Sequence, residues 1–217
     1  MRAKLSIETL CAEAKDFAEV ESRYAEPSLY GVTDGKAIGT YFEHKFRAYL
    51  ATKYDFETGS SAKGIDFPSI GVDMKVTSIK QPQSSCPFKS AREKIYGLGY
   101  SLLVFVYDKT DDKKNATGIL SVMHTIFVAA ARTADYQMTK GLRQILDNDG
   151  NEDDIVAYML DRFLPIDEIG AHALAAEVLR KKPRQGYLTM SNALQWRLQY
   201  GRVIEQAGNV NGLVRVR

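Results

Sequence analysis

The chain has 217 residues, of which 45% are hydrophobic and 26% are charged, and its formal net charge is +2. This is the composition of an ordinary globular protein, long enough for one domain with a good core or for a catalytic domain with a small appendage. The nearly neutral charge excludes a uniformly basic protein, so a surface that binds nucleic acid has to come from a local concentration of basic residues. The stretch from Arg180 onward is such a region, since Glu205 is its only acid.

The cysteine content and the hydropathy pattern indicate a cytoplasmic protein. Cys11 and Cys86 are too few for a disulfide framework and lack the neighbours of a zinc site, so we expect two buried thiols in a reducing compartment. No apolar run approaches the ~18 residues of a membrane span. Charged residues interrupt the apolar positions at the N-terminus, so we expect neither a membrane segment nor a signal peptide.

Apolar residues at helical spacing predict two amphipathic helices in the N-terminal part, over about 6–24 and about 34–53. Thr33 or Asp34 can cap the second helix, and Glu43 lies one residue from its buried stripe. A first strand is predicted over 54–57.

A β-hairpin is predicted next, within the stretch GIDFPSIGVDMKVTS. Its first piece ends at Asp66, a Gly/Pro turn covers 68–71, and a strand covers 72–78. Because side chains alternate across a strand, Asp73 and Lys75 should lie on one face, opposite an apolar face.

The middle of the chain is predicted to complete an α/β core. In chain order, the expected elements are a polar turn at 81–87, a helix at 87–96, a buried strand from Ser101, a mobile charged loop at 109–115 and a strand at 119–129. Together with the earlier strands, these elements predict a mixed central sheet of about five strands flanked by helices.

The C-terminal part is predicted to be helical. Its expected elements are helices at 134–146, 152–163, 166–179 and 191–207 and a short LVRV strand. A boundary in the acidic stretch 147–154 divides the chain into a core domain, 1–147, and a helical region, 148–217.

A pair of aspartates with a lysine is the main candidate site. An acid two positions before a lysine is common in this chain and also occurs at Glu13, Asp34, Glu43, Asp111 and Asp112. The triplet at Asp73 differs because Asp66 lies seven residues upstream across the turn. None of the other triplets has a carboxylate at that spacing.

This combination resembles the PD-(D/E)xK nuclease superfamily, with Asp66 as the first acid and Asp73, Met74 and Lys75 as the D-x-K. The proline here follows the first aspartate. The phrase IGVDMKVT and the upstream GTYFE resemble the MutH-type nicking and restriction endonucleases in particular, over about 39–107. The resemblance implies a restriction-endonuclease-like core.

The residues and the resemblance together predict a magnesium site, with Mn²⁺ as a possible substitute. Hard cations prefer oxygen ligands, so Asp66 and Asp73 would bind the ion. The resemblance adds Glu43 and the backbone carbonyl of Met74 to the ligands, and it implies hydrolysis to a 5′-phosphate and a 3′-hydroxyl. Lys75 would orient the attacking water and stabilise the charge of the transition state.

Two segments are candidates for contact with DNA. The basic and amide-rich residues around the hairpin could follow the phosphate backbone; they are Lys63, Lys80, Gln81, Lys89, Arg92 and Lys94. One face of the predicted last helix could read a major groove, as part of a helix-turn-helix or winged-helix unit, or could be a solvated face on a packing helix; its residues are Asn192, Gln195, Gln199 and Arg202. No ligand role is assigned to His44, His124 or His172.

The expected function is that of a Mg²⁺-dependent, sequence-specific endonuclease acting on double-stranded DNA, as in type II restriction enzymes. The chain has no GxxxxGK[ST] loop that would couple cleavage to nucleotide hydrolysis. A homodimer suits a palindromic site, but a monomer that nicks one strand fits the MutH-like spacing equally well. A repair or junction-resolving nuclease and a non-catalytic DNA-binding protein are the alternatives.

Overall fold

The computed structural model describes residues 2–57, 59, 64–87, 89–192 and 195–217. The chain forms two compact units. The first comprises 1–84, 101–128 and 206–217, and the second comprises 85–100 and 129–205. The predicted boundary near Asp147 therefore falls inside the second unit. Among the described residues, no helix combines the length and apolar character that crossing a bilayer requires.

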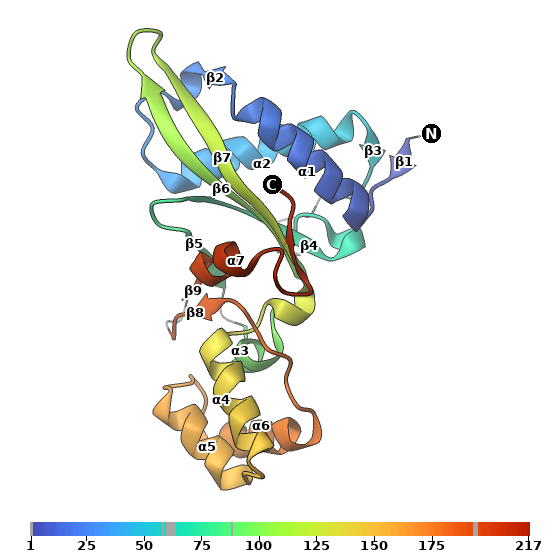
Figure 1. Cartoon of the computed structure of the whole chain (residues 1–217), viewed down its shortest axis with the longest axis vertical. Helices are drawn as coiled ribbons and strands as arrows, with labels where there is room; N and C mark the ends of the chain where they lie inside the picture. The colour runs from blue at the N-terminus through green and yellow to red at the C-terminus, as the bar shows by residue number, and fades with distance from the viewer. Residues whose placement is uncertain (1, 58, 60–63, 88, 193–194) are drawn as a thin grey trace. The chain divides into compact units, whose positions relative to one another are not determined.

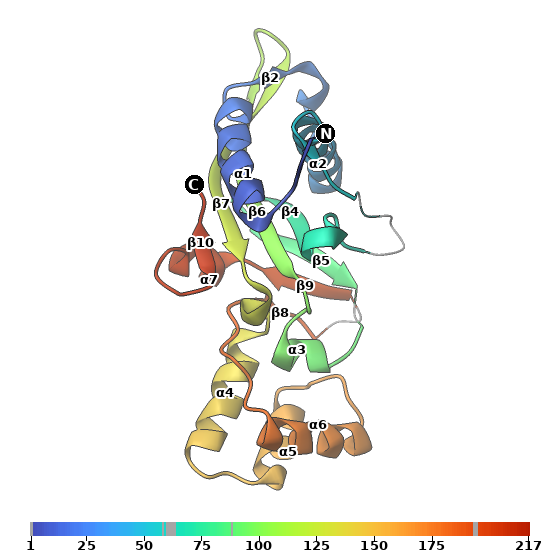
Figure 2. The same cartoon turned by 90° about the vertical axis from the view of Figure 1, so that its right-hand side faces the viewer.

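Two long helices of the first unit confirm the predicted amphipathic helices. Helix α1 covers Ile7–Glu21 and starts with a capping box between Ser6 and Thr9. Helix α2 covers Gly35–Ala51, and the side chain of Asp34 accepts hydrogen bonds from the first free N–H groups of this helix. The two helices pack against each other and against the sheet, α1 on strand β7 and α2 on strand β4 (Figures 1 and 2).

The sheet of the first unit is mixed and has five strands, as predicted, in the order β10-β7-β6-β4 with β2 also paired to β7. The strands are β2 (Ala25–Glu26), β4 (Val72–Ser78), β6 (Ser101–Asp112), β7 (Thr117–Val128) and β10 (Leu213–Arg215). Only the β4–β6 pair is parallel within this sheet. The predicted strand at 54–57 is a short β3 (Tyr54–Asp55) that pairs outside this sheet, with β1 (Ala3–Lys4).

Strands β6 and β7 form a hairpin longer than the sequence predicts (Figure 1). Strand β4 pairs with β6 only as far as Tyr107. Beyond this point β6 continues to Asp112 along β7, so most of the predicted mobile loop at 109–115 is regular strand. Cross-strand pairing accounts for the difference, because the backbone of this charged segment completes its ladder with β7.

Aromatic side chains fill the core between α1, α2 and the sheet. Phe42 and Phe46 of α2 contact Phe105 of β6, with ring centroids 4.8 and 5.3 Å apart, and Phe17 of α1 contacts both. Phe46 also meets Phe67 edge-on, next to the predicted site. This packing fixes α2 over β4, where the candidate residues lie.

The second unit contains helices α3 (Arg92–Tyr96), α4 (Tyr136–Asp147), α5 (Glu152–Asp161) and α6 (Glu168–Arg180). Their buried faces share one apolar cluster that includes Ile95, Leu142, Ile155 and Val178. A small sheet has the order β5-β9-β8, from Gln83–Pro87, Gln195–Gln199 and Thr189–Met190. The described residues also form three short 3₁₀ turns, Pro27–Leu29, Pro68–Ile70 and Ala130–Arg132.

Two sequence predictions for this part are wrong. The polar turn at 81–87 contains strand β5, and the helix at 191–207 is replaced by strand β9 and a short helix α7, Gly201–Gln206. Trp196, Leu198 and Tyr200 are buried while Arg197 and Gln199 between them are exposed. This alternation is the period of a strand, so the predicted helical face for reading a groove does not exist.

Candidate active site

A tight turn brings Asp66 to the start of β4, as predicted. The turn Pro68–Ile70 ends at Gly71, whose φ of +61° is a left-handed conformation that glycine adopts without strain. The backbones of Phe67 and Val72 exchange hydrogen bonds of 2.9 and 3.2 Å across this turn. The carboxylate of Asp66 then accepts a hydrogen bond from the N–H of Met74, at 2.8 Å.

Strand β4 presents Asp73 and Lys75 on the same side. The Lys75 Nζ lies 2.8 Å from the Asp73 Oδ2. The register of β4 on β6 pairs Asp73 with Leu102 and Lys75 with Val104, so the two side chains belong to the strand at one edge of the sheet. Asp73 is only 4% exposed, and Val72 and Met74 on the opposite face are also buried. The strand is thus covered on both faces.

Helix α2 contributes Glu43 and Arg47, which are one helical turn apart. The Nη2 of Arg47 forms an ion pair and hydrogen bond with the Oδ1 of Asp66. Sequence reasoning found Glu43 but missed Arg47. The available signal was its position four residues after Glu43, beside the buried Phe46.

The acids of the site are only partly neutralised by the basic side chains around them. Burial raises the pKa of Glu43 to about 7, and the charge of Asp66 adds to this shift. Burial also raises the pKa of Asp73 to about 6, with Lys75 opposing the shift and Asp66 reinforcing it. A cluster in which carboxylates raise one another's pKa favours the binding of a further cation.

The donor set fits a hard divalent cation. Carboxylate oxygens of Glu43, Asp66 and Asp73 lie on α2, the turn and β4, and such oxygens are the ligands that Mg²⁺ prefers. However, no three His, Cys, Asp or Glu side chains in the described ranges are already gathered as a metal site. Asp66 is engaged by Arg47 and by the Met74 N–H.

The raised pKa values predict how the stability of the metal-free protein depends on pH. The folded-state values of about 7 for Glu43 and about 6 for Asp73 lie above the ordinary values of 4.5 and 3.8, so folding favours the protonated carboxyls. The free energy of unfolding therefore rises as pH falls from about 7 toward the ordinary pKa values of these two groups, and it decreases as pH rises through the same range. In EDTA, Glu43→Gln should flatten the change in Tm between pH 5 and pH 8. An unchanged slope in thermal melts of this variant would contradict the assignment.

The residues predicted to follow DNA lie in different surroundings. Lys80 and Gln81 follow β4 and are exposed, as the prediction requires. Lys63 lies outside the described residues. In the second unit Lys89 is exposed, with its Nζ 5.4 Å from the centre of the Tyr100 ring.

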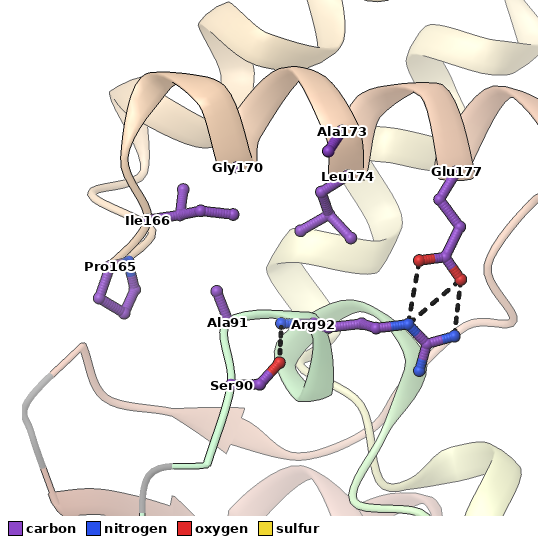
Figure 3. Close-up of a pocket in the computed structure, with 9 residues that line it drawn as sticks. All are labelled: Ser90, Ala91, Arg92, Pro165, Ile166, Gly170, Ala173, Leu174 and Glu177. Atoms are coloured by element: carbon purple, nitrogen blue, oxygen red, sulfur yellow. Dashed lines mark hydrogen bonds and ion pairs between the residues drawn. The ribbon is translucent and has the colours of Figure 1, made fainter.

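Other predicted DNA contacts are held by partners within the second unit. Arg92 donates to both carboxylate oxygens of Glu177, at 2.6 to 3.2 Å, on the wall of a pocket between α3 and α6 (Figure 3). Lys94 is 5% exposed and donates to the side chain of Asn192, so it does not belong to a solvent-facing segment.

The remaining candidates from the predicted last helix lie on other elements. Gln195 and Gln199 belong to strand β9, and Gln199 is exposed. Arg202 of α7 has its guanidinium 3.7 Å from the centre of the Tyr136 ring. These positions no longer share a helical face.

Comparison with known proteins identifies the class of this protein. A family model described as "Type II restriction enzyme NspV" matches residues 4–215. A curated relative from Nostoc sp., named "Type II restriction enzyme NspV", is 64% identical over 212 residues, which cover 98% of this chain and 96% of the relative. No solved structure matches the chain.

The class is therefore that of the type II restriction enzymes. The chain belongs to the family of the type II restriction enzyme NspV. It is a site-specific deoxyribonuclease that acts on double-stranded DNA, which confirms the activity predicted from the sequence. Enzymes of this class generally need divalent metal ions.

Proposed function

We propose that Glu43, Asp66, Asp73 and Lys75 are the catalytic site of this enzyme and that it is of the PD-(D/E)xK type. The observation that carries the proposal is the position of Asp66, which the turn places on the backbone of β4 beside the Asp73–Lys75 pair. Residues that the sequence separates by a turn thus meet at one end of the edge strand β4. The raised pKa values of Glu43 and Asp73 support a site that takes up a cation.

Each residue has a role that follows from its chemistry. Glu43, Asp66, Asp73 and the backbone carbonyl of Met74 would hold Mg²⁺, or Mn²⁺ in its place. When bound, such an ion neutralises phosphate charge and makes a nearby water more acidic. Lys75 orients the attacking water and stabilises the negative charge that develops on the phosphate. The water oxygen bonds to phosphorus, the bond to the O3′ atom breaks, and O3′ takes up a proton, leaving a 5′-phosphate.

The exposed polar residues beyond β4 are the proposed DNA contacts of the first unit. Lys80 and Gln81 are solvent-facing and directly follow the catalytic strand, so they can reach backbone phosphates near a bound scissile bond. In the second unit we propose Lys89 and Gln199, which are exposed. Arg92 would have to release Glu177 before it could bind a phosphate.

We propose a homodimer as the active form, because palindromic sites suit two-fold symmetry. Cys11 and Cys86 are free thiols, which supports function in a reducing compartment such as the cytoplasm.

Cleavage of supercoiled plasmid tests this function. With Mg²⁺ or Mn²⁺ the enzyme should give discrete linear fragments from the earliest times, and EDTA should abolish cleavage because the carboxylates alone cannot neutralise the phosphate. Sequencing of the fragment ends should show one recognition site and 5′-phosphates. Persistent open circles would instead support a MutH-like nickase, and full activity in EDTA would refute the metal-dependent site.

A further inference from the structure

Arg47 lies next to one of the carboxylates that we propose as metal ligands. Its guanidinium pairs with Asp66. Its charge also lowers the pKa of Glu43 against the opposing effects of burial and Asp66. Arg47 is thus a cation in contact with one proposed metal ligand and electrostatically coupled to a second.

The ion pair with Asp66 does not satisfy every hydrogen-bond donor of Arg47. Its side chain is 25% exposed and that of Asp66 is 14% exposed, so the pair is partly shielded from water. The Nε of Arg47 is buried and, within the described structure, has no hydrogen-bond partner. A buried donor without an acceptor destabilises the conformation that buries it. The guanidinium therefore does not satisfy all of its donors where it lies.

A carboxylate oxygen that accepts from a guanidinium is less available to a metal ion. Asp66 has two oxygens: Oδ2 accepts from the Met74 N–H, and Oδ1 accepts from Arg47. The Met74 bond occupies Oδ2, which leaves Oδ1 as the oxygen that a metal ion would bind. Arg47 and a divalent cation thus compete for the same atom.

We propose that Arg47 is a positioning residue that substitutes for the metal ion in the metal-free site and releases Asp66 when the ion binds. This inference rests on the proposed function, because it takes Asp66 as a metal ligand. In the metal-free enzyme Arg47 limits the repulsion among the acids and keeps Asp66 oriented. In the metal-bound enzyme its guanidinium is free to meet another acceptor, such as a phosphate oxygen of the DNA.

The test is calorimetric titration of the full chain with Mn²⁺ in the absence of DNA. Arg47→Gln should bind Mn²⁺ about tenfold more tightly than wild type, because the competing charge is removed while hydrogen bonding is kept. The same variant should melt at a lower temperature than wild type in EDTA, and Mn²⁺ should raise its Tm by a larger amount.

Lys45→Gln is the matched control, since it removes a positive charge and an ion pair with the buried Glu21 from the same helix. Its affinity for Mn²⁺ should stay within about threefold of wild type, because Lys45 makes its ion pair with Glu21 and not with the site. Arg47→Lys keeps the charge and should bind Mn²⁺ more weakly than Arg47→Gln.

The failure of this inference is distinct from that of the proposed function. If Arg47→Gln binds Mn²⁺ as weakly as wild type or more weakly, Arg47 does not compete with the ion. If wild type binds no Mn²⁺, or if Asp66→Asn leaves binding unchanged, the proposed metal site itself is wrong. A crystal structure of the wild-type enzyme with Mn²⁺ gives a second test that needs no variant. An ion pair between Arg47 and Asp66 that persists beside the bound ion would overturn the inference.

Discussion

Lys75→Ala is expected to lower the single-turnover rate of DNA cleavage by at least about 1,000-fold while the protein stays folded and bound to DNA. The Lys75 ammonium lies 2.8 Å from Asp73 on β4, beside the carboxylates that we assign to the metal ion. It supplies both orientation of the water and stabilisation of the transition-state charge, so no neighbouring group replaces it. Rapid-quench assays at saturating DNA measure this rate, and filter binding measures the affinity.

The chain offers a matched control for this substitution on the adjacent strand. Lys109 of β6 also forms an ion pair with an aspartate two residues away, Asp111, and its side chain is 12% exposed. Lys109→Ala therefore removes the same kind of side chain and the same kind of contact from a neighbouring strand. Its cleavage rate should remain within about threefold of wild type, because Lys109 lies beyond Tyr107, where β4 no longer pairs with β6, and its ion pair is with Asp111.

Phe46→Ala is expected to destabilise the first unit by about 3–5 kcal/mol. The Phe46 side chain is fully buried, and its ring contacts Phe17, Phe67 and Phe105. Its loss leaves a cavity between α2 and the sheet, at the level of Glu43 and Arg47. Urea unfolding followed by circular dichroism should show the lower stability. Cleavage should also be slower at temperatures where the variant is still folded, because α2 no longer fixes Glu43.

Phe163→Ala provides the comparison for Phe46, since the Phe163 side chain is 79% exposed. This second substitution should change stability by less than about 0.5 kcal/mol. A loss of less than about 1 kcal/mol in Phe46→Ala would mean that the aromatic core does not hold α2 on the sheet.

The site could be predicted from the sequence largely because its signals are local. Asp66, the Gly/Pro turn and the strand of Asp73 and Lys75 lie within ten residues, and turn residues and alternation determine their geometry directly. Helix α2 was predictable because Asp34 caps it and its apolar stripe is clear. The contact between these two elements depends on residues that are far apart in the sequence, because Phe46 packs against Phe67 and Phe105.

The sequence predictions failed where a helical period and a strand period fit the same residues. They also failed where the contact partner of a residue lies far away in the sequence. Trp196 and Tyr200 are four residues apart, which suits a helix, but the buried Leu198 between them makes the pattern that of a strand. The sequence predicts Lys94 as a surface lysine, because its hydrogen-bond partner Asn192 lies 98 residues away in the chain. Arg47 was missed for the same reason: its position one turn after Glu43 was visible, but its partner Asp66 lies 19 residues further along the chain, outside α2.

The single-turnover cleavage rate of Lys75→Ala, measured beside wild type and Lys109→Ala on one DNA duplex with Mg²⁺, tests the proposed site most directly. The proposed site predicts a loss of at least about 1,000-fold with DNA affinity within about threefold of wild type and an unchanged circular dichroism spectrum. A rate within about tenfold of wild type would contradict the proposed site, because removing a group that stabilises the transition state should slow cleavage by more than this.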